Sequence, residues 1–215
     1  MDSKKLSTIF RSEYTKKSLD DDMLIKNPFD QFNQWFQGWV QTNPETPNAM
    51  TLSTATNKGT PSSRIVLLKH FDQEKLTFFT DYTSKKGQDL KNNPIGSLLF
   101  FWDKHEQTVR IEGTIKKTNL KESDEYFFSR PKNSQIAAII SNQSQKINSQ
   151  KELLEKFKKA KEDYKNKPII RPKEWGGYAL TPNYFEFWQG KPNRLHDRIS
   201  YQKEDSHWII SRLYP

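Results

Sequence analysis

The sequence of 215 residues contains no cysteine. This absence excludes disulfides, thiol nucleophiles, iron–sulfur clusters and cysteine-ligated zinc. The four histidines, His70, His105, His196 and His207, show no HExxH motif and no other tight ligand spacing. We therefore expect no metal site in this protein.

Several familiar motifs are missing as well. No stretch approaches the ~18 apolar residues that a transmembrane helix needs, and residues 1–14 are charged, without the apolar core of a signal peptide. We expect a cytoplasmic protein with no membrane partner. Neither GxGxxG nor GKS or GKT occurs, so the usual dinucleotide and triphosphate cradles are absent. No serine lies in a GxSxG elbow, although composition alone leaves a Ser–His–Asp hydrolase open.

Arginine is scarce in this strongly basic chain. The formal net charge is +9, and 27 lysines stand against 8 arginines. Such a charge invites a nucleic-acid interpretation, but the lysines are spread along the chain as on solvated faces, so we expect no nucleic-acid partner. A chain that otherwise prefers lysine keeps arginine where a planar, bidentate donor must meet an anion. The motifs below contain five of the eight: Arg11, Arg64, Arg130, Arg194 and Arg198.

The composition otherwise suits a folded protein. Its 33% apolar and 13% aromatic content is typical of a globule, and the length fits one domain with a real core. We expect residues 1–20 to form a mobile N-terminal segment and residues 21–215 to form a single domain.

Helical patterns occur at several places. Pro28 predicts the first turn of a helix, and an aromatic stripe at helical spacing follows it. The stripe favours core packing over a cofactor site, and it consists of Phe29, Phe32, Phe36 and Trp39. Ser149 and Glu152 form a capping box before another amphipathic helix. Shorter helices are predicted over residues 84–92, 120–129 and 134–141.

Extended patterns outnumber the helical ones. Asn57-Lys58-Gly59 predicts a hairpin turn between strands over residues 50–56 and 62–71. Because the links are short and show no βαβ alternation, we predict a mainly antiparallel sheet or barrel with helices packed outside, an α+β fold. The other strands are predicted over residues 76–80, 95–102, 108–117, 177–181 continuing into 184–188, 194–202 and 207–213.

Two segments place cations beside hydroxyl or backbone donors. In a regular strand, Arg64 and Lys69 would point to opposite faces and serve two different anions, although a buried strand with charged ends explains them equally well. The segment from Tyr126 through Arg130 to Ser134 ends in a predicted helix start, whose free amides favour a phosphate. A plain helix–helix corner is the slightly favoured alternative for that segment taken alone.

Two further segments show the same combination. Thr80 is followed by Ser84 and a pair of lysines, Lys85 and Lys86, at a helix start, a weak signal that two solvated lysines would also give. Near the C-terminus, residues 194–198 read RLHDR. On a strand, its two arginines and its histidine would project from one face, and such a cluster favours an anion or an electron-rich ring between them. A solvated basic edge strand is the alternative.

Five segments in order resemble the pyridoxine/pyridoxamine 5′-phosphate oxidase family. They are RIVLLKH (64–70), SRPKNSQI (129–136), NQSQ (142–145), EFWQG (186–190) and RLHDR (194–198). The similarity is near-collinear from about Arg11 to Pro215. The resemblance implies an FMN-binding split β-barrel that works as a homodimer, with FMN at the subunit interface.

The resemblance also implies roles for single residues. FMN contacts are expected from Arg64, Ile65, Val66, Leu67, Leu68, Lys69, Phe79, Thr80, Lys85, Lys86, Thr108, Gln143, Ser144, Trp188 and Arg198. Substrate contacts are expected from Lys69, Tyr126, Arg130 and Ser134 at the phosphate, and from Arg194, Leu195 and His196 at the ring. Catalytic roles are expected for Arg194 and His196, together with Arg11 and Tyr14 from a segment that closes over the active site.

Three positions depart from the family pattern. Thr108 stands where the family usually has Gln, so a flavin contact is shortened there. Lys85 replaces a frequent Arg, which keeps the charge but loses the bidentate geometry. Phe79 replaces a frequent Tyr, which leaves only a backbone contact.

The implied activity is oxidation of pyridoxamine or pyridoxine 5′-phosphate to pyridoxal 5′-phosphate, with oxygen as acceptor and hydrogen peroxide as product. Because the cofactor performs hydride removal, the absence of a strong nucleophile or carboxylate pair is consistent with it. Three alternatives stay open: another split-barrel flavin enzyme such as a flavin reductase, a non-catalytic pyridoxal phosphate binder, and a nucleic-acid binder.

Overall fold

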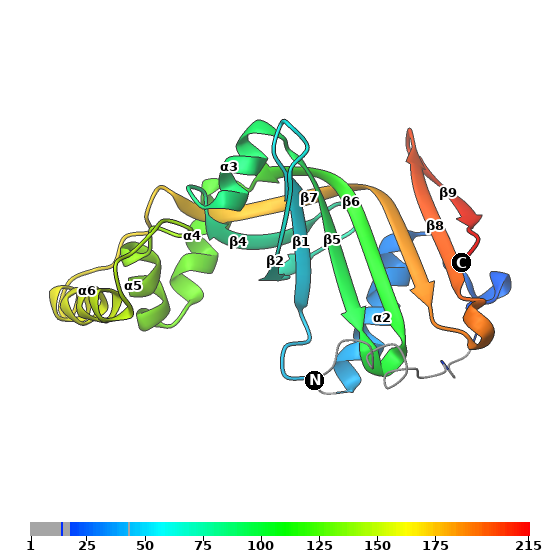
Figure 1. Ribbon diagram of the computed structural model, residues 1–215, viewed down its shortest axis with the longest axis horizontal. Coiled ribbons are helices and arrows are strands. Elements are labelled where there is room, and N and C mark those ends of the chain that lie inside the picture. Colours follow the sequence, from blue (N-terminus) through cyan, green and yellow to red (C-terminus); the bar gives the residue numbers. More distant parts are fainter. Residues whose placement is uncertain (1–13, 15–17, 43) are drawn as a thin grey trace, which may run out of the picture. The chain divides into compact units, whose positions relative to one another are not determined.

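The computed structural model describes Tyr14, residues 18–42 and residues 44–215 (Figure 1). These residues fall into two compact units. Unit 1 comprises the described residues up to Pro47 together with residues 98–111 and 183–215, and unit 2 comprises residues 48–97 and 112–182. Three strands run through both units: β5 (Ile95–Trp102), β6 (Gln107–Lys117) and β7 (Trp175–Gln189).

In unit 1, helix α2 (Pro28–Gln41) supplies an aromatic face to the core. The side chain of Asn27 accepts the N–H of Phe29 at 2.9 Å, and Pro28 has no N–H that needs a partner. The ring of Phe32 lies 5.1 Å from Phe100, and each fully buried aromatic side chain contributes roughly 1.5–3 kcal/mol. The predicted core role is confirmed for Phe29, Phe32 and Trp39, whereas Phe36 is only half-buried. Trp35, which was not predicted, is also buried.

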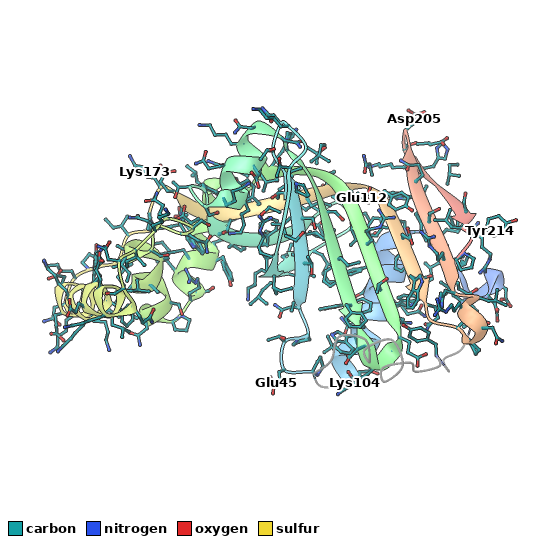
Figure 2. All side chains as sticks on the ribbon, in the orientation of Figure 1. Glu45, Lys104, Glu112, Lys173, Asp205 and Tyr214 are labelled. Atoms are coloured by element: carbon teal, nitrogen blue, oxygen red, sulfur yellow. The ribbon has the colours of Figure 1, made fainter. Side chains whose placement is uncertain are left out.

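A C-terminal hairpin completes the sheet of unit 1. Strands β8 (Asp197–Glu204) and β9 (His207–Arg212) pair antiparallel, and β8 also pairs with the second half of β7 (Figure 1). The register places Trp188 opposite Arg198. Asp205, labelled at the tip of the hairpin in Figure 2, has a φ of 50°, which a short polar residue tolerates in a tight turn. Short 3-10 turns lie at Asp21–Met23 (η2), Asp103–His105 (η3) and Pro192–Arg194 (η4).

In unit 2, two antiparallel pairings position the polar residues of interest. Strands β1 (Ala49–Ala55) and β2 (Pro61–Leu67) form the predicted hairpin, with Leu52 opposite Arg64 and Gly59 of the turn at a φ of 79°. Strand β4 (Leu76–Asp81) pairs with β3 (His70–Phe71) and with the first half of β7, so that Thr80 lies opposite Gly176.

Helix α3 (Lys85–Asn92) of unit 2 begins close to the end of β4. The hydroxyl of Ser84 caps it by accepting the N–H of Gly87. A Cβ atom at Gly87 would lie 2.1 Å from the carbonyl oxygen of Tyr82, so only glycine permits this approach. The approach brings the first turn of α3, with its two lysines, beside Thr80.

Three helices of unit 2 follow β6: α4 (Leu120–Ser129), α5 (Lys132–Ile140) and α6 (Gln150–Asp163). The predicted cap of α6 is confirmed, because the hydroxyl of Ser149 accepts the N–H of Glu152 at 3.1 Å. Helix α5 begins two residues earlier than predicted, since Pro131 takes the cap position and already has a suitable φ.

The strand pairings confirm the predicted fold class, a mainly antiparallel sheet with flanking helices. Hydrogen-bonded neighbours follow the order β2-β1-β5-β6-β7-β4-β3, with β8 pairing β7 and β9. Two predicted strands are too long: the strand over 62–71 is interrupted after Leu67, and the strand over 194–202 begins only at Asp197. Within the described residues, no helix has the length and apolar character needed to cross a membrane.

Candidate active site

Unit 2 contains a cleft of about 630 Å³, and most of the predicted cofactor residues line it. Strand β2, the end of β4, the start of α3 and the segment after α5 all contribute to its walls. The predicted residues in this lining are Arg64, Ile65, Val66, Leu67, Lys69, Phe79, Thr80, Lys85, Lys86, Tyr126, Arg130, Gln143 and Ser144.

The structure corrects one inference about this lining. Arg64 and Lys69 were expected on opposite faces of one strand, but both line the same cleft. Strand β2 ends at Leu67, so the two-residue alternation does not extend to Lys69. Leu68 is only 4% exposed and packs in the core, so its side chain does not line the cleft as the other members of the run do.

Lys86 is the most enclosed cation of the cleft. Its Nζ donates to the side-chain oxygen of Gln143 at 2.8 Å, to the hydroxyl of Thr80 at 3.2 Å and to that of Ser84 at 3.3 Å. Thr80 also donates to the same Gln143 oxygen at 2.9 Å. Because this oxygen is occupied, the NH₂ group of Gln143 remains to meet a ligand.

Burial lowers the pKa of Lys86 to about 8, and the positive charge of Arg64 acts in the same direction. An anion placed between Lys86 and Arg64 would favour the charged form of Lys86 and so oppose the lowering of its pKa. Ser144 beside Gln143 holds a φ of 71°, a left-handed conformation that a non-glycine residue adopts at a cost. The structure thus provides a cationic cradle, formed by Arg64, Lys85 and Lys86, with polar donors around it.

An aromatic wall adjoins this cradle in the cleft. The ring of Phe79 stacks on Tyr126 at 4.0 Å and on Trp175 at 5.8 Å, with interplanar angles of 25° and 16°. The ammonium of Lys69 lies 5.7 Å from the centre of the Tyr126 ring. Trp175 was not predicted as a site residue, because an aromatic at the start of a strand looks like core in the sequence.

Arg130 carries a buried donor that needs an acceptor. Its guanidinium lies 4.7 Å from the centre of the Trp175 ring, and among the described residues its Nη1 finds no hydrogen-bond partner. Burial lowers the pKa of Arg130, which a bound anion would counteract. Helix α4 ends before Arg130, yet both Arg130 and Tyr126 face the cleft. Ser134, in the first turn of α5, does not line it.

Unit 1 holds a second group of predicted residues. The ring of Tyr14 lies edge-on to Trp188 at 5.5 Å and to His196 at 5.4 Å, and the last two rings are 4.7 Å apart. The Nδ1 atom of His196 accepts the backbone N–H of Lys191 at 3.1 Å. In the neutral imidazole the proton therefore sits on Nε2, which makes this nitrogen a hydrogen-bond donor.

The predicted strand face at residues 194–198 is wrong. Arg194 lies in the 3-10 turn η4, with a φ of 61°, and β8 begins only at Asp197. Pro192 and Asn193 turn the chain at this point, with Asn193 at a φ of 57°, so the side chains do not alternate as on a strand. Arg194 and Leu195 are exposed in the structure, with Leu195 at 68%. The strained turn is a feature often found at ligand sites.

Arg198 is held by an acidic residue that the sequence did not single out. Its Nε donates to Glu186 at 2.9 Å, and the other oxygen of Glu186 accepts Arg110 at 2.5 Å and the Tyr184 hydroxyl at 3.1 Å. Glu186 is only 7% exposed. Glu186 lies two residues before Trp188 on the same strand, so the two side chains share one face of the sheet. This spacing could have identified Glu186 from the sequence.

The predicted cofactor residue Thr108 does not line the cleft of unit 2. Thr108 lies on β6 in unit 1, and its neighbour Gln107 points to the other face of the strand, where it donates to Gln189 at 2.9 Å. Gln107 therefore does not take the place of the glutamine that the family resemblance led us to expect at position 108. Arg11 lies outside the described residues.

Comparison with known proteins decides the family. The sequence profile of "Pyridoxamine 5′-phosphate oxidase" matches residues 38–162, and that of "Pyridoxine 5′-phosphate oxidase C-terminal dimerisation region" matches residues 175–215. The chain belongs to the pyridoxamine 5′-phosphate oxidase family. A pyridoxine/pyridoxamine 5′-phosphate oxidase from Paraburkholderia phytofirmans is 49% identical over 95% of this chain and 97% of that protein. One from Crocosphaera subtropica is 48% identical over 97% and 99%.

Solved structures support the same fold. PhzG from Burkholderia lata 383, in complex with tetrahydrophenazine-1-carboxylic acid, matches with a TM-score of 0.88 and 25% identity, over 95% of this chain and 100% of that one. A pyridoxamine 5′-phosphate oxidase-related, FMN-binding protein from Nostoc punctiforme matches with a TM-score of 0.69 and 14% identity, over 87% and 97%. The predicted split-barrel fold class is thereby confirmed.

The residues of the cleft fit the FMN that was predicted from the sequence. Arg64 and Lys86 offer charge-assisted donors for a phosphate, and the Nη1 of Arg130, which has no partner in the described part of the chain, can meet a second anion. The flat wall around Phe79 supplies apolar surface for aromatic rings. Family membership supports FMN as the cofactor.

Proposed function

We propose that the protein oxidises pyridoxamine 5′-phosphate or pyridoxine 5′-phosphate to pyridoxal 5′-phosphate, with oxygen as electron acceptor and hydrogen peroxide as product. With the amine substrate, C4′ becomes an aldehyde carbon: water supplies the aldehyde oxygen, and the nitrogen leaves as ammonia. When bound, FMN supplies the hydride-accepting chemistry that no side chain can perform. The observation that carries the proposal is the pairing of two anion sites in one cleft, at Lys86 and at Arg130.

Each anion site has a proposed ligand. The cradle of Arg64, Lys85 and Lys86 would hold the FMN phosphate at the start of α3, where the helix N-terminus also favours negative charge. Arg130, Lys69 and Tyr126, which line the same cleft, would hold the substrate phosphate. Ser134, in the first turn of α5, would add its hydroxyl when the phosphate binds. A charge-assisted hydrogen bond of this kind contributes roughly 1.5–3 kcal/mol.

The group in unit 1 would orient the substrate ring. His196, with its proton on Nε2, would donate a hydrogen bond from that nitrogen. Arg194 would place its guanidinium at the reacting carbon, and the exposed side chain of Leu195 would add an apolar contact. We propose that Arg11 and Tyr14 cover this group when substrate is present. The ring of Tyr14 already contacts both Trp188 and His196.

We further propose a homodimer with one FMN at each subunit interface. The chain carries the family's C-terminal dimerisation region, residues 175–215. Large apolar side chains are exposed on two strands, among them Ile65 at 65% on β2 and Phe101 at 68% on β5. Such exposed apolar surface on strands is expected of an interface. In this dimer, Trp188 and Arg198 would reach the FMN. A cytoplasmic location stays a prediction.

Three alternative functions differ from the proposed one in the molecule that the protein would turn over or bind. A flavin reductase would use the FMN cradle but would need neither Arg130 nor His196. A non-catalytic binder of pyridoxal phosphate would consume no oxygen. The similarity to PhzG raises oxidation of a tricyclic carboxylate as a further possibility, but two clustered cations beside a stacked aromatic wall favour a small phosphorylated ring.

The experiment is a substrate panel on purified protein with added FMN. We expect oxygen uptake and pyridoxal 5′-phosphate formation with pyridoxamine 5′-phosphate, and at most about 1% of that kcat/KM with unphosphorylated pyridoxamine, because the phosphate contacts are lost. NADH with excess flavin and tetrahydrophenazine-1-carboxylate complete the panel. Turnover of either of these in preference to the B6 phosphates would replace the proposal.

A further inference from the structure

A buried carboxylate, Asp89, lies directly behind the cationic cradle. It belongs to α3 and is only 4% exposed. One oxygen accepts Lys85 Nζ at 2.5 Å, and the other accepts the hydroxyl of Thr54 at 2.8 Å. Neither the proposed reaction nor the family resemblance gives this residue a role.

Thr54 connects Asp89 to the principal arginine of the cradle. The Thr54 hydroxyl gives its single proton to Asp89, and its oxygen accepts Arg64 Nη1 at 2.8 Å. Arg64 also donates to the backbone oxygen of Leu52 at 3.2 Å and to the hydroxyl of Ser62 at 2.7 Å. The direction of each bond is therefore fixed, and the three bonds set the plane of the guanidinium.

The negative charge of Asp89 also interacts with Arg64. Burial acts to raise the pKa of Asp89, but hydrogen bonds from Lys85 and Thr54 and the charges of Lys85 and Arg64 bring it below its usual value. Burial lowers the pKa of Arg64, and the charge of Asp89 opposes that shift. Asp89 is thus ionised, and it stabilises a guanidinium that would otherwise be desolvated beside Lys86.

Lys85 and Asp89 differ in their freedom to move. The side chain of Lys85 is 51% exposed, whereas that of Asp89 is 4% exposed. Lys85 can therefore leave the pair for a ligand, but Asp89 stays against Thr54. After such a movement Asp89 keeps its hydrogen bond with Thr54, and Thr54 in turn accepts a hydrogen bond from Arg64.

We propose that Asp89 is a positioning residue that orients Arg64 through the hydroxyl of Thr54, so that the guanidinium plane is preset for the phosphate of FMN. The inference rests on the proposed function, because it takes FMN as the ligand of the cradle. It extends that function by a residue pair, Asp89 and Thr54, that would touch no ligand atom. Loss of this residue pair should weaken the binding of the FMN phosphate and leave the binding of the flavin ring unchanged.

The test compares FMN with riboflavin, which lacks the phosphate, by fluorescence titration of the full-length apoprotein. D89A and T54V should each raise the Kd for FMN by about 10-fold or more, since the orienting bond to a charged group is lost. The double variant D89A/T54V should be no weaker than either single variant, because both remove one chain of bonds. Riboflavin binding should stay unchanged in all three.

Two variants serve as controls. D89N keeps an oxygen for the Thr54 hydroxyl and releases Lys85, so its FMN affinity should stay within about threefold of wild type. E155Q breaks the same kind of lysine–acid pair on the exposed face of α6, and it should change neither Kd. If D89A fails to fold, T54V carries the test, because valine has nearly the same shape as threonine.

Three results would overturn the proposal: an FMN Kd of D89A and T54V within twofold of wild type, equal weakening of FMN and riboflavin, or D89N as weak as D89A. The last would mean that Asp89 acts by charge alone. Failure of the wild-type protein to bind FMN at all would be a different outcome. It would refute the proposed function, and the role of Asp89 would fall with it.

Discussion

Lys86 gives the proposed FMN site a pH dependence that can be calculated. Its pKa of about 8 in the folded chain lies below the usual value of 10.5, chiefly because it is buried. A bound phosphate favours the charged form and should keep Lys86 protonated through pH 9. Protons are then taken up on binding above pH 8, so FMN affinity falls as pH rises.

The magnitude follows from this linkage. With an unbound pKa of about 8, the fraction of charged Lys86 falls about tenfold between pH 7 and pH 9, and the Kd for FMN should rise about 10-fold over that range. The stability of the apoprotein should change in the opposite direction. The unfolded chain binds more protons at this lysine between pH 8 and 10.5, so the free energy of unfolding rises with pH there.

The assay is fluorescence titration of FMN at pH 7, 8 and 9. K86M should raise the Kd at pH 7 by roughly 10- to 100-fold, through loss of a charge-assisted bond, and should leave little pH dependence. K91M, at the exposed end of the same helix, serves as the matched control. A wild-type Kd that changes less than twofold between pH 7 and 9, or a K86M variant with the wild-type slope, would refute the reasoning.

Three further predictions concern substrate and cofactor. K69A and R130A should each raise KM for the phosphorylated substrate by about 10- to 100-fold, and an unchanged steady-state KM in both would remove the phosphate assignment. R194A should mainly lower kcat, as stopped-flow flavin reduction would show; a normal rate would exclude Arg194 from the reacting end. T108Q should tighten FMN binding by about 2- to 10-fold in titration, through one added hydrogen bond, and a weaker complex would contradict the family comparison.

Local chemistry made much of the fold predictable from the sequence. Pro28 after Asn27, the serine cap at Ser149 and the turn ending in Gly59 each define their own conformation within a few residues. The cleft cations Arg64 and Lys86 were assigned through the family resemblance, because the local pattern alone gave only a weak signal for them. The prediction of a single domain over residues 21–215 stays a prediction.

The errors arise where one local signal competes with another. At Arg194, the alternation of charges suggested a strand, but Pro192 and Asn193 just before it are turn formers, and they determine the backbone. At Lys69, the strand was extended through an apolar run, although the pairing with β1 ends at Leu67. In both places the direction of the side chain differs from the prediction.

The missed residues depend on contacts that are distant in the sequence. The proposed role of Asp89 depends on β1 and β2, which bring Thr54 and Arg64 to it and which no local pattern indicates. Its spacing of four from Lys85 was the available signal. Trp175 gains its role only when β4 and β7 pair and place it beside Phe79.

The central claim is tested most directly by the stoichiometry of one reaction. Purified protein, FMN and pyridoxamine 5′-phosphate are mixed in air-saturated buffer, and oxygen, hydrogen peroxide and pyridoxal 5′-phosphate are measured together. We predict one pyridoxal 5′-phosphate and one hydrogen peroxide formed for each oxygen consumed, with strong loss of rate in R130A. Bound FMN without any pyridoxal 5′-phosphate formed would contradict the account.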